Sequence, residues 1–297
     1  MGFYSNIERV FDWLFSPKIR ASFERFILVL ASIGFVIHLA LIFLKRLQFD
    51  LPFNDALLLS DPISAIYTPF SFILVYEAYL LIYYLPRSFT TSISKQYEII
   101  ALVVIRKIFK DIPHIEMSND WFKSEYNIQI WVDLSGILIL FFLIYLFQKT
   151  REKLPIKTVS PRINRFIASK KLISILLIPT LLILAAISFS DWLVSTFCSE
   201  SLVDPSLSNI NHVFFNNFFT MLIFTDVFIL LLSFQYTLRN SQLIRNTGFI
   251  ISTVLLRLSF SAEGLFNIVL ILIGVVFGLL ILLTYNAIET ETKMQTD

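Results

Sequence analysis

Six apolar runs, each about as long as the 20 residues that span a bilayer, constrain the fold of this chain most strongly. In lipid, a helix satisfies its own backbone hydrogen bonds, which an open strand does not. The chain is 56% hydrophobic and only 15% charged. The sequence therefore predicts an all-α, polytopic integral membrane protein. The runs are 26–45, 65–85, 129–148, 172–192, 214–236 and 264–285.

The number of spans depends on two shorter apolar runs, 97–112 and 246–261. The link 149–171 contains eight lysine and arginine residues and one acid, and such links lie on the cytoplasmic side of membranes. The polar links 86–96 and 237–245 are also basic. If both short runs cross, all three links and both chain termini are cytoplasmic. If neither crosses, the most basic link lies outside, so we expect about eight transmembrane helices.

An acid and an arginine recur in the same order in the two halves of the chain. Glu77 precedes Arg106 in the first half, and Asp226 precedes Arg257 in the second. At 1.5 Å per residue, the acid and the base of each half lie at similar depth, about 12–16 Å from the cytoplasmic ends of their helices. Lone charges inside membrane spans are costly. The sequence therefore predicts two intramembrane charge pairs, either structural or lining a path through the protein.

This recurrence predicts a duplication of a four-helix unit. Because four is an even number of crossings, both copies enter the membrane from the same side and form parallel repeats. The expected organisation is a cytoplasmic interfacial segment, a first repeat, a basic cytoplasmic link, a second repeat and a cytoplasmic tail. These parts are 1–25, 26–148, 149–171, 172–285 and 286–297.

The N-terminal segment 3–16 has an apolar face at helical spacing. Such a helix lies in the membrane interface or packs against the bundle, and the sequence favours neither alternative. The apolar face consists of Ile7, Val10, Phe11, Leu14 and Phe15.

Two further polar residues within the apolar runs are secondary candidates for a functional site. His38 lies in the middle of the first run, where an interhelical hydrogen bond is more common than a proton relay. Asp133 lies in the outer part of its run, within reach of Lys107 or Lys110.

The last apolar run contains a Gly-x-x-x-Gly pattern, formed by Gly274 and Gly278. Small residues at this spacing allow two helices to approach closely. We expect the pattern to mark helix packing, inside the protein rather than between subunits.

Several classes of function lack sequence support. No catalytic motif was found, and no pair of histidines has metal-ligand spacing, so no enzyme activity, metal or cofactor is predicted. The net charge of +2 is too small to indicate a basic surface that binds nucleic acid. The lipid bilayer is the one predicted partner of the apolar runs.

Two functions are compatible with the sequence. The first is a transporter or channel for a small solute or ion, which the paired charges favour. The alternative is a non-catalytic membrane subunit or scaffold that anchors a protein partner through the link 149–171. The short loops and the absence of glycosylation sequons favour a bacterial inner membrane. The oligomeric state is not predicted.

Overall fold

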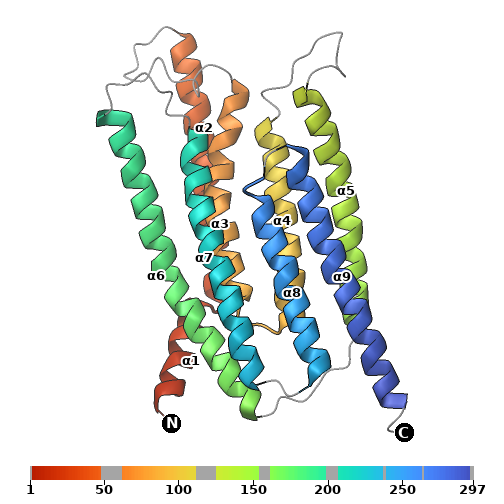
Figure 1. The fold of residues 1–297 in the computed structure, drawn as a ribbon. Coiled ribbons are helices and arrows are strands. Elements are labelled where there is room, and N and C mark those ends of the chain that lie inside the picture. The colour runs from red at the N-terminus through yellow and green to blue at the C-terminus, as the bar shows by residue number, and fades with distance from the viewer. Residues whose placement is uncertain are drawn as a thin grey trace.

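A computed structural model describes residues 2–47, 62–111, 125–153, 161–198, 207–236, 239–262 and 264–294. Within these ranges the chain forms helices and turns and no strand, which confirms the all-α prediction. Eight long helices of the described residues lie side by side in one bundle (Figure 1). They are α2 (Pro17–Arg46), α3 (Tyr67–Tyr84), α4 (Phe89–Asp111), α5 (Glu125–Glu152), α6 (Pro161–Cys198), α7 (Leu207–Tyr236), α8 (Asn240–Ser259) and α9 (Leu265–Met294). A shorter α1 (Gly2–Leu14) precedes them, and a 3-10 helix, η2 (Pro62–Ile66), leads into α3.

Six helices in the described part of the chain are long and apolar enough to cross a membrane. They correspond to the six long apolar runs, and they are α2, α3, α5, α6, α7 and α9. The protein is therefore an integral membrane protein. α1 and the end of α9 lie at the same end of the bundle (Figure 1).

The two short runs belong to longer helices than the sequence predicted. α4 has 23 residues and α8 has 20. At 1.5 Å per residue these lengths are about 34 and 30 Å, close to the thickness of a hydrocarbon core. The predicted links 86–96 and 237–245 are mostly helical, which corrects their assignment as links. Neighbouring helices bury the polar side chains in the first turns of α4 and α8. The two helices therefore extend into segments whose hydropathy is low. The buried polar residues there are Thr90, Ser92, Ser94, Gln96 and Asn246.

The hydrophobic core divides into two main clusters, each of which draws helices from both halves of the chain. One cluster lies among α4, α5, α8 and α9. The other is formed mainly by α1, α3, α6 and α7, and α2 packs on α3 at its side. Within each half, consecutive helices contact one another. Between the halves, α4 touches α8 and α5 touches α9. The two halves are therefore packed into each other.

The amphipathic helix α1 packs against α6. The apolar residues Ile7, Phe11 and Phe15 are buried. Glu8 Oε1 lies 3.6 Å from Lys171 Nζ, and this ammonium group lies 5.2 Å from the centre of the Phe11 ring. Of the two alternatives for this segment, the structure shows packing on the bundle.

The last helix continues beyond its apolar run and includes most of the predicted tail 286–297. Asn286 Nδ2 donates a hydrogen bond to the carbonyl oxygen of Thr150, at 3.3 Å. Glu289 is buried in the same region. The end of α9 is thus held against α5 rather than projecting as a separate segment.

The two glycines of the Gly-x-x-x-Gly pattern face α8 and α4. Ser252 Oγ donates to the carbonyl oxygen of Gly274 at 2.7 Å, and the buried Tyr97 hydroxyl lies 2.7 Å from the same Oγ. A Cβ atom at Gly278 would occupy the position of the Tyr97 hydroxyl. A Cβ atom at Gly274 would lie 3.2 Å from Leu256. The pattern therefore serves packing within the protein.

We expect Gly278→Ala to destabilise the protein more than Gly274→Ala does. The new methyl group at position 278 meets a buried hydroxyl, and overpacking of this kind costs about 1–3 kcal/mol. Adding Tyr97→Phe to Gly278→Ala should recover part of the loss, because the hydroxyl oxygen is removed. Thermal unfolding in detergent measures these differences. A Gly274→Ala variant at least as unstable as Gly278→Ala would contradict this account.

Candidate functional site

The structure brings each predicted acid to the arginine with which the sequence paired it. Arg106 of α4 lies 3.4 Å from Glu77 of α3, measured from Nη2 to Oε2. Arg257 of α8 lies 2.6 Å from Asp226 of α7, measured from Nη1 to Oδ2. Both acids and Arg257 are at most 3% exposed. Each half of the chain therefore contains a buried ion pair between its second and third long helices.

The second pair is embedded in a hydrogen-bond network that reaches the first half of the chain. Thr253 Oγ1 donates to Asp226 Oδ2 at 2.9 Å. Arg257 Nη2 donates to Gln96 Oε1 at 3.2 Å, and Gln96 Nε2 donates to Ser92 Oγ at 3.3 Å. The network thus connects α7 and α8 to α4.

The first pair also contacts the backbone of α3. Arg106 Nη1 also donates to the carbonyl oxygen of Phe70, at 3.4 Å. Both carboxylate oxygens of Glu77 are buried and accept no hydrogen bond from the described residues. The two pairs therefore have the same composition but different surroundings.

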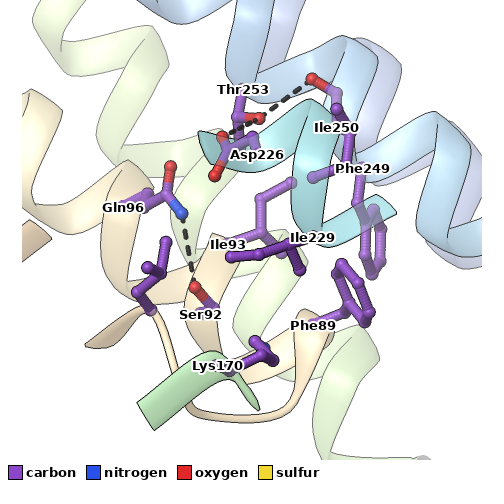
Figure 2. Close-up of a pocket in the computed structure, with 11 residues that line it drawn as sticks. Phe89, Ser92, Ile93, Gln96, Lys170, Asp226, Ile229, Phe249, Ile250 and Thr253 are labelled. Carbon is purple, nitrogen blue, oxygen red and sulfur yellow. Dashed lines mark hydrogen bonds between the residues drawn. The ribbon is translucent and has the colours of Figure 1, made fainter. Parts of the chain in front are cut away.

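The second pair borders a small cavity (Figure 2). Its volume of about 20 Å³ is enough for one water molecule. Figure 2 shows Asp226 and Lys170 at opposite ends of this region, with Ile93 and Ile229 between them. Apolar side chains form the rest of the lining. The polar residues of the lining are Ser92, Gln96, Lys170, Asp226 and Thr253.

Lys170 is the one charged residue of this cavity that the sequence analysis did not select. It was counted with the basic link 149–171, but α6 begins well before the apolar run and carries Lys170 into the bundle. Its side chain is 3% exposed. Its Nζ donates to the carbonyl oxygen of Arg87 at 2.6 Å and lies 4.8 Å from the centre of the Phe89 ring. A helix that starts at Pro161 includes Lys170. This proline is therefore the signal in the sequence that could have placed Lys170 within a helix.

The secondary candidates lie in other contacts. His38 Nδ1 is 2.6 Å from Thr68 Oγ1, which links α2 to the start of α3. Asp133 Oδ2 is 3.3 Å from Lys107 Nζ, which links α5 to α4. The side chain of Lys110 lies outside the described residues. Neither His38 nor Asp133 lines the cavity beside Asp226.

Comparison with known proteins assigns no activity to this site. No protein-family model matches the chain, and no curated protein or solved structure is similar to it. In the part of the chain that the structure describes, no three histidine, cysteine or acidic side chains are placed to hold a metal ion. The arrangement places one carboxylate and one ammonium group at the same small cavity.

We expect the loss of one partner of the second pair to be more harmful than the loss of both. Arg257→Leu leaves the Asp226 carboxylate buried without its counter-charge, and breaking a buried pair in this way costs about 3–5 kcal/mol. Adding Asp226→Leu removes the stranded charge and should restore part of the stability. The fraction of monodisperse protein after extraction into detergent, together with its melting temperature, measures the effect.

The same comparison applies to Arg106→Leu with and without Glu77→Leu. A smaller recovery is expected there, because the two groups lie 3.4 Å apart rather than 2.6 Å. Additive damage in both double variants would show that the paired residues do not stabilise each other.

Proposed function

We propose that this protein is a transporter or channel for a small ion, and that the cavity beside the Asp226–Arg257 pair is part of the ion's path. The observation that carries this proposal is a buried acid at a small cavity, lined in part by polar side chains, within a membrane bundle. Ionisable residues inside membrane spans commonly mark ion paths or proton relays. The volume of about 20 Å³ suits one water-sized species and is too small for an organic solute.

The proposed topology has eight membrane spans, arranged as two parallel four-helix repeats. The lengths of α4 and α8 support it, as does the position of α1 and the end of α9 at one end of the bundle (Figure 1). The basic link 149–171 favours a cytoplasmic location for that end. The corresponding places of the two ion pairs support the duplication.

In this proposal the two ion pairs have different roles. Asp226 lines the cavity, whereas neither Glu77 nor Arg106 does. The first pair therefore holds α3 against α4, and the second pair holds α7 against α8 while also facing the ion's path.

The alternative proposal is a non-catalytic scaffold that binds a protein partner through its basic end. One observation supports it, which is that three basic residues near this end are exposed. They are Lys149 on α5, Lys153 just after α5 and Arg165 on α6. An exposed basic surface is also what the positive-inside rule produces without any partner. We therefore favour transport.

Reconstitution of the purified protein into liposomes tests the proposal. We expect wild-type protein to give ion flux above that of empty liposomes, measured for H⁺, Na⁺, K⁺ and Cl⁻ in turn. Asp226→Asn should reduce this flux by at least about tenfold, equivalent to about 1.4 kcal/mol in the barrier. Asp133→Asn is the matched control, because Asp133 is also buried and paired but lies outside the cavity lining.

Three results would contradict the proposal. Wild-type protein without flux of any of these ions would reject transport and favour the scaffold. Undiminished flux in Asp226→Asn would remove the cavity from the path. An equal loss of flux in both aspartate variants, with both proteins monodisperse, would also reject a path that depends on this cavity.

A further inference from the structure

We propose that the transported ion is the proton, and that Lys170 exchanges protons with Asp226 across the cavity. This inference rests on the proposed transport function and names its substrate. Asp226 of α7 and Lys170 of α6 are the charged groups of the lining. The residues that line the cavity from α4 and α8, and Leu85 beyond the end of α3, are uncharged. Arg257 lies against Asp226 and is not part of the lining.

The composition of the cavity disfavours a metal cation. Calcium and magnesium require about six or more oxygen ligands, most often from carboxylates, carbonyls and water. This cavity offers one carboxylate, from Asp226, which Arg257 already neutralises. The ammonium group of Lys170 at the other end repels any cation, including a monovalent one.

An anion is disfavoured as well, because the cationic groups already have partners. Arg257 is bound to Asp226 and to Gln96, and the ammonium group of Lys170 donates to the Arg87 carbonyl oxygen. The negative charge of Asp226 repels an incoming anion. A single water, in contrast, fits the volume and finds several polar partners in the lining. The cavity therefore suits a proton, which a water molecule can pass from one group to another.

The proposed transfer moves one proton and no electrons. An N–H bond of the Lys170 ammonium breaks and its proton passes to the cavity water, while that water gives a proton to the Asp226 carboxylate, where an O–H bond forms. Lys170 is left as a neutral amine and Asp226 as a neutral acid. Arg257 then keeps its hydrogen bond to Gln96 and faces a neutral carboxylic acid in place of the carboxylate. Lysine suits this role because its ammonium group can lose a proton in a protein interior, whereas arginine stays charged.

Lys170 lies toward one end of the bundle. Its ammonium group is bonded to the carbonyl oxygen of Arg87, which belongs to the turn between α3 and α4. That turn lies at the same end of the bundle as α1 (Figure 1). Under the proposed topology this end is cytoplasmic, so Lys170 lies on the cytoplasmic side of the cavity.

The structural alternative is that Lys170 only stabilises the turn between α3 and α4, through its hydrogen bond to the Arg87 carbonyl oxygen. Lys170→Arg separates the two roles, because a guanidinium can still donate to the Arg87 carbonyl oxygen but does not release its proton. Lys171→Arg is the matched control, since Lys171 faces α1 through Glu8 and does not line the cavity.

The experiment measures proton entry into liposomes that contain the full-length protein and a pH-sensitive dye. A potassium gradient with valinomycin supplies the voltage. We expect wild-type protein to acidify the lumen, Lys171→Arg to behave like wild type, and Lys170→Arg to lose at least about tenfold in rate, or about 1.4 kcal/mol in the barrier. The melting temperature of Lys170→Arg should stay close to that of wild type. If Lys170→Arg does not fold, Lys170→Gln is measured instead, because its amide also donates to the Arg87 carbonyl oxygen.

The outcomes distinguish this inference from the function on which it rests. Proton flux that persists in the folded Lys170 variant would overturn the role of Lys170. Flux of Na⁺, K⁺ or Cl⁻ without proton flux would overturn the proton as substrate and leave transport in place. The absence of flux for every ion in wild-type protein would reject both.

Discussion

The Asp226–Arg257 ion pair is the interaction on which the centre of this bundle depends. An isolated charge in an apolar interior is costly, so each group lowers the cost of burying the other. The 2.6 Å contact joins α7 to α8, and the second nitrogen of the guanidinium group reaches Gln96 on α4. One pair of charges therefore connects three helices from both halves of the chain. The same pair places a carboxylate at a small cavity whose lining includes Lys170, Gln96 and Thr253.

The sequence predicted the parts of the fold that follow from long-range regularities. The six long apolar runs became six long helices, because about 20 apolar residues leave few alternatives in lipid. The partners Glu77–Arg106 and Asp226–Arg257 could be matched because helices joined by a short link are usually neighbours. Both predictions rest on spacing within a single half of the chain.

The features that the sequence did not predict depend on contacts between the halves. The polar first turns of α4 and α8 resemble links, since nothing local shows that neighbouring helices cover them. Lys170 resembles an ordinary cytoplasmic charge until α6 is seen to start well before its apolar run. The bond from Arg257 to Gln96 spans 161 positions, a separation at which single-sequence patterns carry no information about contact. The cavity is assembled from such contacts and was missed for the same reason.

The bond from Ser252 to the Gly274 carbonyl and the fit of Tyr97 beside Gly278 have a mechanical consequence. They oppose sliding of α9 along α8 and α4, because sliding would break the Ser252–Gly274 bond and move Gly278 out of register with Tyr97. The other core cluster, which includes α6 and α7, contacts these helices along an interface between the two clusters. The cavity lies at this interface, with Lys170 and Asp226 on one side and Gln96 on the other. A displacement of one cluster against the other would therefore stretch the Asp226–Arg257 contact, which crosses this interface beside the cavity.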